Sequence, residues 1–192
     1  MLGIIKRNFT SLDKQMFLNL YKTLVRPYME YATTVWSPHL KKDIFILENT
    51  QRRATKLVSA IKNYEYEERL RILGLPTLTY RRERNDVIQI FKILNNIDKL
   101  EKDLFFKDAN KTTTRGHSMK LAKGHSRLNI RAKAFSQRSV NAWNSLSESC
   151  ICSQTVNNFK SNLNEHWMRH PRKLRLNWST TQCTRRATQE KS

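Results

Sequence analysis

Apolar side chains recur every three or four residues along most of the chain, which is the spacing of helices that bury one face. A first helix is predicted to begin at Ser11, whose hydroxyl can accept a hydrogen bond from the opening turn, and to reach about Val25. Pro27 lacks an amide donor and disfavours helical backbone at the residue before it, so we expect a kink there. An aromatic-rich continuation is expected over residues 28–36.

Residues 40–58 carry the clearest helical pattern in the chain. The stripe expected to be buried follows steps of four and three residues and consists of Leu40, Ile44, Leu47, Gln51, Ala54 and Val58. At about 100° per residue, several cations fall on the opposite side, namely Lys42, Arg52, Arg53 and Lys56. We therefore expect a helix with one buried face and one cationic face.

Two further helices are predicted before residue 95. A short helix over residues 65–73 should end at Gly74, because glycine suits the left-handed position after a helix. A longer helix follows, with an apolar side made of Tyr80, Val87, Ile90, Phe91 and Leu94. Its first turns hold Arg81, Arg82 and Arg84. Cations at a helix amino terminus oppose the macrodipole, so either local acids such as Glu83 and Asp86 or an external anion must compensate them.

The last third of the chain is predicted to hold two helices and a tail. One helix covers residues 132–143, and another follows the cap Thr155, with an apolar face made of Val156, Phe159, Leu163 and Trp167. The loop-like composition of residues 111–117 places a subdomain boundary near Asn110. The sequence therefore predicts an all-α protein with a bundle-like subdomain over residues 1–110, a smaller basic helical subdomain over residues 111–168 and a basic, disordered tail over residues 169–192.

Composition supports a helical, strongly basic protein. Four glycines and four prolines in 192 residues are too few for the turns of a β-sandwich or barrel. Lys and Arg number 36 against 16 Asp and Glu, a formal net charge of +20, which indicates polyanionic partners. Residues 109–147 contain no acid, and their cations are Lys111, Arg115, Lys120, Lys123, Arg127, Arg131, Lys133 and Arg138. Nucleic acid, contacted mainly at its phosphates, is the favoured partner, with anionic membranes or acidic proteins as alternatives.

Several classes of protein are disfavoured. The longest run without a charged residue, residues 149–159, is shorter than the roughly 18–20 residues of a membrane helix. The first residues lack the apolar core of a signal peptide, and three cysteines are sparse, so we expect an intracellular protein of the nucleus or cytoplasm. Trp36, Trp143 and Trp167 could stack on bases, but each lies on an apolar stripe, which favours core packing.

No catalytic residue, cofactor site or metal site is predicted. Nucleotide-binding, serine-hydrolase and zinc-protease motifs are missing, and the six aspartates are too scattered to hold the two metal ions of a nucleotidyl transferase. One set of residues resembles zinc ligands: Cys150, Cys152, His166 and His170. A single residue between the cysteines strains tetrahedral ligation, so two neutral thiols and two surface histidines are the favoured interpretation.

Several motifs, in order, resemble the region that follows the polymerase palm in jockey-like non-LTR retrotransposon reverse transcriptases. The stretch of residues 48–57 is similar to that family's "E-x-x-Q-R-R-A-T-K-L" motif, and residues 69–82 to its "R-L-x-x-L-x-L-x-x-L-x-x-R-R" segment. The other matching stretches are residues 20–32, 35–38, 114–117, 135–138, 143–146 and 159–160. The similarity covers about residues 2–168, with Ser147 in place of the family's usual proline and no counterpart for the tail.

The resemblance implies a thumb followed by a helical carboxy-terminal domain, with the endonuclease and the polymerase palm encoded before Met1. A thumb grips the template–primer duplex, so the expected function is non-catalytic nucleic-acid binding. The expected phosphate contacts are Arg52, Arg53, Lys56, Arg81, Arg82, Arg84, Arg115, Lys120, Lys123, Arg127, Arg131, Lys133 and Arg138. The alternatives are a helical interaction module or an inert element remnant, and, with least support, residual polymerase activity.

Overall fold

The computed structural model describes residues 1–109 and 116–169, and this part of the chain is all-α apart from one two-stranded sheet. The amino-terminal helices are α1 (Leu2–Asn8), α2 (Lys14–Leu20), α3 (Arg26–Glu30), α4 (Thr33–Trp36), α5 (Lys41–Thr55), α6 (Tyr66–Leu73) and α7 (Leu78–Leu94), with a π-helical turn η1 (Tyr21–Val25) and a 3₁₀ turn η2 (Ser59–Ile61). The later elements are α8 (Lys102–Phe105), β1 (Lys107–Asp108), β2 (Leu121–Ala122), α9 (Asn129–Ala132), α10 (Phe135–Arg138), α11 (Val140–Asn144), α12 (Glu148–Ile151) and α13 (Val156–Arg169).

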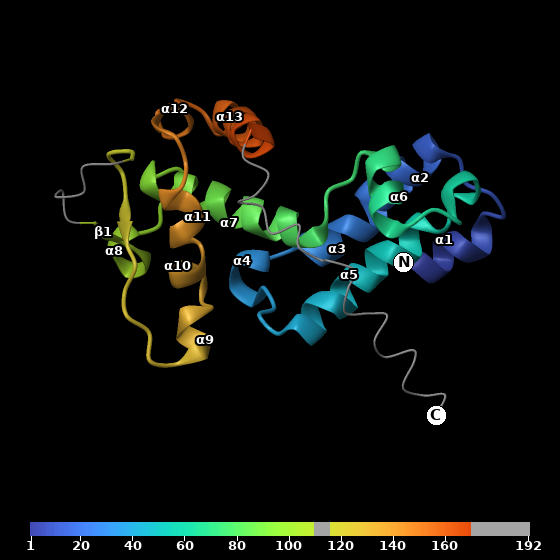
Figure 1. The fold of residues 1–192 in the computed structure, drawn as a ribbon, viewed down its shortest axis with the longest axis horizontal. Helices are drawn as coiled ribbons and strands as arrows, with labels where there is room; N and C mark the ends of the chain where they lie inside the picture. The colour runs from blue at the N-terminus through green and yellow to red at the C-terminus, as the bar shows by residue number, and fades with distance from the viewer. Residues whose placement is uncertain (110–115, 170–192) are drawn as a thin grey trace.

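Two hydrophobic clusters lie in two groups of helices, and α7 runs from one group to the other (Figure 1). The first cluster draws its residues from 5–75 and the second from 87–167. The apolar side of α7 belongs to the second cluster, where Phe91 stacks on Phe159 with ring centroids 4.2 Å apart. Residues 116–168 therefore share a core with α7, whereas the sequence predicted the subdomain boundary near Asn110. The tail beyond Arg169 lies outside the described residues.

The first predicted helix begins later than expected. Asp13, not Ser11, caps α2, because its carboxylate accepts a hydrogen bond of 2.6 Å from the backbone N–H of Met16. Leu12 is buried and forms a parallel β-bridge with Val58, which keeps the chain extended up to Asp13. The π-helical turn η1 ends at Val25, before Pro27, and the backbone stays helical at Arg26, so Pro27 lies in the first turn of α3 instead of at the predicted kink.

The predicted continuation over residues 28–36 is broken at Ala32. The backbone of Ala32 is left-handed, with φ of 49°, so α3 and α4 are separate short helices. The predicted helix over residues 132–143 is broken as well. It consists of α9, α10 and α11, because the backbone at Ala134 is extended. By contrast, the ends predicted at Gly74 and Thr155 are confirmed, since Gly74 is left-handed and the Thr155 hydroxyl accepts from the backbone N–H of Asn158.

The predicted stripe of α5 is buried only in its carboxy-terminal half. Gln51, Ala54 and Val58 are fully or nearly fully buried, whereas Leu40 is 54% exposed, so its assignment to the core is wrong. Leu40 precedes the first turn of α5 and has an extended backbone there. The acid Glu48, which the predicted stripe does not include, is also buried.

A buried hydrogen-bond network fixes α5 against its neighbours. The hydroxyl of Tyr66 in α6 donates to the Glu48 carboxylate, which also accepts from the backbone N–H of Leu78 at 3.1 Å. The Gln51 amide donates to the Tyr66 hydroxyl at 3.0 Å and accepts from the hydroxyl of Tyr21 at 2.6 Å. Burial raises the pKa of Glu48 above its usual range, while the hydrogen bonds from Tyr66 and Leu78 counteract this shift. One polar network thus connects η1, α5, α6 and the first turn of α7.

The network predicts a stability difference between two neighbouring tyrosines. Tyr66→Phe removes a donor to the buried Glu48 carboxylate and an acceptor for Gln51, so we expect the free energy of unfolding to fall by about 1–3 kcal/mol. Tyr64→Phe is the matched control, because Tyr64 is exposed, and it should stay within about 0.5 kcal/mol of the unmodified protein. Chemical denaturation measures both values. Equal effects of the two substitutions would contradict the role given to Tyr66.

Candidate nucleic-acid interface

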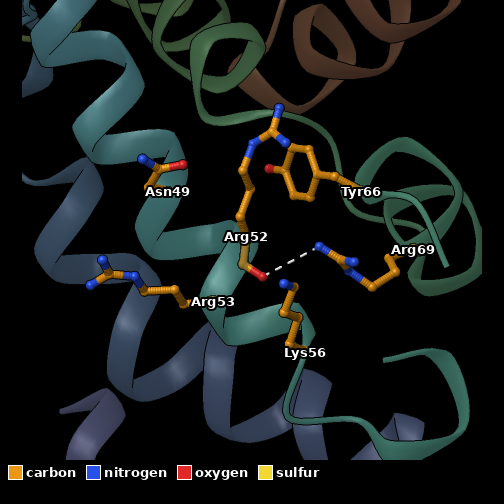
Figure 2. A pocket seen from close by; sticks show the side chains of 6 residues that line it. All are labelled: Asn49, Arg52, Arg53, Lys56, Tyr66 and Arg69. Carbon is orange, nitrogen blue, oxygen red and sulfur yellow. Dashed lines mark hydrogen bonds between the residues drawn. The ribbon is translucent and has the colours of Figure 1, made fainter. Parts of the chain in front are cut away.

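A cationic hollow lies between the last turns of α5 and the helix α6. Its volume is about 310 Å³, and we name it the α5–α6 hollow (Figure 2). Its lining is Asn49, Arg52, Arg53, Lys56, Tyr66 and Arg69. The sequence predicted three of these residues as a cationic face of one helix, and the structure adds a second helix opposite them.

The rotation of α5 brings its cations to the hollow. Glu48, Gln51 and Thr55 are buried, and they lie three and four residues apart on one face of the helix. Arg52 and Lys56 each follow a buried position by one residue, so they lie about 100° around the helix from the face that the core holds. The residues that fix α5 therefore also determine where its cations point.

Arg69 is the main functional candidate that the sequence analysis missed. Its side chain is buried, and its Nε donates to the Thr55 hydroxyl at 3.0 Å while its Nη1 donates to the carbonyl of Tyr64 at 2.6 Å. Burial, and then the positive charge of Arg52, lower the pKa of the Arg69 guanidinium. The adjacent acids Glu67 and Glu68 give this helix a mixed charge, so no run of cations marks Arg69, although Arg69 is the first residue of one of the family-like motifs.

Arg52 is held in place by an aromatic ring. Its guanidinium carbon lies 4.2 Å from the centroid of the Tyr66 ring, a cation–π contact. The carbonyl of Arg52 accepts a long hydrogen bond of 3.5 Å from Nη2 of Arg69, drawn as a dashed line in Figure 2. The Nε of Arg52 is buried and has no hydrogen-bond partner among the residues that the structure describes. The ring of Tyr66 thus orders the guanidinium, and the buried Nε–H is left without a partner inside the described part of the protein.

The cations of the α5–α6 hollow form no ion pair in the described part of the chain, although the charge of Arg52 opposes the rise in the pKa of the buried Glu48. Within residues 1–109 and 116–169, no carboxylate lies within 4.0 Å of the charged groups of Arg52, Arg53, Lys56 or Arg69. The nearby acid Glu48 is buried and bound to Tyr66 and to the start of α7. The hollow is therefore a concentration of positive charge that can accept an anion.

The arginines predicted on α7 have internal partners instead. Arg81 forms a two-pronged ion pair with Glu30, in which Nη2 lies 2.8 Å from Oε2. Arg82 is only 4% exposed, and its Nη2 donates to the Thr79 hydroxyl at 3.0 Å. Arg84 donates to Asn164 of α13 at 3.0 Å. Acids and neutral oxygens within the protein thus compensate these cations, so they are not gathered into a surface for an external anion.

Arg138 also serves the fold. Its guanidinium makes hydrogen bonds of 2.8 and 3.0 Å to the Asp86 carboxylate, and its Nη2 also reaches the carbonyls of Thr33 and Thr34. Burial raises the pKa of Asp86, and the hydrogen bonds from Arg138 counteract that shift. Arg138 therefore ties α10 to α7 and α4.

The other cations predicted in the basic segment lie apart from the α5–α6 hollow. Lys123, Arg127, Arg131 and Lys133 are exposed around β2 and α9, and Lys120 is half-buried. Figure 1 shows α9 and α6 in different groups of helices. Arg115 lies outside the described residues. The structure thus brings together Arg52, Arg53 and Lys56 but does not bring the β2–α9 cations to them.

The residues considered for zinc do not form a metal site in the described part of the chain. No group of three or more His, Cys, Asp or Glu side chains there could hold a metal ion. Cys150 is buried, Cys152 is exposed, and His170 lies outside the described residues. Among the tryptophans, Trp143 and Trp167 are in the core as predicted, whereas Trp36 is 39% exposed.

Known proteins give no guide to this site. A comparison of the chain with protein-family models, with curated proteins and with solved structures finds no match. No helix in the described part of the chain is long and apolar enough to cross a membrane.

Substitution of an arginine with an internal partner should affect stability more than substitution of an exposed arginine. Arg138→Gln leaves the buried Asp86 carboxylate without its cation, so we expect the free energy of unfolding to fall by about 3–5 kcal/mol. Arg53→Gln changes an exposed side chain without an ion pair and should stay within about 0.5 kcal/mol of the unmodified protein. Urea denaturation of both variants checks the difference. A small effect of Arg138→Gln would show that its pairing with Asp86 is not structural.

Proposed function

We propose that the protein binds nucleic acid through its phosphates and catalyses no reaction on it. The observation that supports this proposal most strongly is the α5–α6 hollow, which is lined by four cationic side chains without a carboxylate partner among the described residues. Like charges held this close repel one another, and a bound polyanion relieves that repulsion. RNA, DNA and hybrid duplexes all present suitable phosphates.

We also propose that the chain derives from the thumb and carboxy-terminal region of a jockey-like non-LTR retrotransposon reverse transcriptase. Two of its family-like motifs contact each other at the hollow. Thr55 belongs to the stretch of residues 48–57 and Arg69 to that of residues 69–82, and their side chains are 3.0 Å apart. A direct contact between two motifs supports their origin as parts of one site.

The proposed interface has two separate parts. The first is the α5–α6 hollow, and the second is the set of exposed cations Lys123, Arg127, Arg131 and Lys133. Arg81, Arg82, Arg84 and Arg138 are left out, because internal partners occupy their guanidinium groups. The proposed interface therefore uses none of the three α7 arginines that the sequence analysis predicted as phosphate contacts.

A second candidate function is a helical interaction module. Tyr28, Tyr31 and Val35 are 69%, 80% and 83% exposed around α3 and α4, which is unusual for large apolar side chains so near to one another in the sequence. Such residues are typical of a surface that contacts another protein. This observation is compatible with nucleic-acid binding at the hollow, because the hollow lies on α5 and α6.

The nucleic-acid proposal predicts a salt-dependent loss of affinity. Changing Arg52, Arg53 and Lys56 together to Gln should weaken binding to a short RNA–DNA hybrid. It should also reduce the slope of log affinity against log salt by up to about 2–2.7, because each of the three lost phosphate contacts removes roughly 0.7–0.9 released ions. Filter binding between about 50 and 200 mM salt measures both quantities.

The matched control changes three exposed lysines that lie outside α5 and α6, Lys6, Lys14 and Lys22, to Gln. This control loses the same formal charge, so it should lower affinity much less if the hollow is the binding site. An unchanged salt slope in the variant of Arg52, Arg53 and Lys56, or equal losses of affinity in this variant and the control, would show that the hollow is not part of the interface. An unmodified protein without salt-dependent binding would leave the interaction module as the better proposal.

A further inference from the structure

The shape of the α5–α6 hollow is that of a site for a small group. A backbone contact along a duplex needs only a cationic ridge or face, because the phosphates lie on the outside of the helix. Here side chains of α5 and α6 line a space of about 310 Å³, in which the Arg52 guanidinium lies on the Tyr66 ring, Lys56 lies near Arg69, and Arg53 points away from α6 (Figure 2). That volume is at the lower end of small-molecule sites, so it accommodates a phosphate with its attached sugar.

The charge of the hollow exceeds what a backbone phosphate supplies. A phosphodiester in the middle of a strand carries one negative charge. The dipole of α5 adds only about half a negative charge at its carboxy terminus. The side chains of Arg52, Arg53, Lys56 and Arg69 carry four positive charges. A terminal phosphate monoester carries about −1.5 to −2 at pH 7 and has three free oxygens, so it compensates this site better.

The donors of the hollow are also suited to several oxygens on one group. Arg53 and Lys56 are exposed and free of ion pairs within the described residues, so their donors are accessible to a ligand. Arg69 is anchored by Thr55 and Tyr64, and its Nη2 makes only a long contact of 3.5 Å. Burial, followed by the positive charge of Arg52, lowers the pKa of Arg69, a direction that a nearby anion would oppose.

We propose that the α5–α6 hollow binds the terminal phosphate monoester of a nucleic-acid strand. This inference rests on the proposed function and gives it a preferred ligand: a strand end that carries a phosphate, in addition to any phosphates along the duplex. Arg53 and Lys56 contact the phosphate oxygens, Arg52 is held ready by the ring of Tyr66, and Arg69 supplies a fixed positive charge at the wall. Asn49 lines the same space and offers its amide to the sugar.

The test compares hybrid duplexes of one sequence whose ends carry a 5′-phosphate, a 3′-phosphate or only hydroxyl groups. We expect the full chain to bind at least one of the phosphorylated forms about tenfold or more tightly than the hydroxyl form, because new charge-assisted hydrogen bonds form. In the variant Arg53→Gln with Lys56→Gln, the ratio of affinities for phosphorylated and hydroxyl ends should fall close to one. Both residues are exposed, so the variant should fold, and its circular dichroism spectrum checks this.

The control variant changes Arg127, Arg131 and Lys133 together to Gln. It should weaken binding to every duplex and keep the preference for phosphorylated ends, because these residues lie outside the hollow. Equal affinity of the unmodified protein for all three duplexes would overturn the inference and leave the proposed function intact. A preference that survives in the Arg53 and Lys56 variant would overturn it too, since the phosphate would then bind elsewhere.

A competition arm separates a strand end from a free phosphate compound. A nucleoside monophosphate, added at constant ionic strength, should displace the phosphorylated duplex only weakly, because it lacks the contacts along the strand. If the nucleoside monophosphate displaces the duplex at concentrations near the Kd of the duplex, the hollow is a site for small phosphate monoesters, and the strand-end proposal is overturned. Absence of binding to any duplex would overturn both this inference and the proposed function.

Discussion

The hydrogen bonds of Glu48 and Gln51 with Tyr66 are the constraint on which the rest of the site depends. They fix how α5 is rotated against α6, and the bond from Leu78 to Glu48 joins the start of α7 to the same point. A buried carboxylate is costly unless it is fully hydrogen-bonded, so this arrangement tolerates little displacement. Because α5 cannot turn, its cations stay opposite Arg69, and the hollow between the two helices is an ordered feature.

The positive charge of the protein is divided between two tasks. Arg81 and Arg138 form ion pairs with Glu30 and Asp86, and these pairs connect α7 to α3, α4 and α10. The cations of the α5–α6 hollow have no such partners in the described part of the chain, and neither have the exposed cations around β2 and α9. The net charge of +20 is therefore not spread uniformly over the surface. Part of it stabilises the fold, and part of it is available to a polyanion.

Sequence reasoning succeeded where one helix determines the outcome. Periodicity predicted α5, α7 and α13 and placed Arg52, Arg53 and Lys56 on one face, because these properties depend on neighbours three and four residues apart. It failed for contacts between residues that are far apart in the sequence. The pairing of Arg138 with Asp86 joins segments 52 residues apart, and the place of Arg69 in the hollow depends on how α6 packs on α5. Spacing along one chain segment contains no information about such contacts.

The most direct test of this division of charge is an NMR titration that follows the arginine Nε–H signals while an RNA–DNA hybrid with phosphorylated ends is added. The account predicts that the signals of Arg52, Arg53 and Arg69 shift first and furthest, while those of Arg81 and Arg138 stay in place. Shifts of Arg81 and Arg138 as large as those of the hollow, or no shift at the hollow at all, would contradict it.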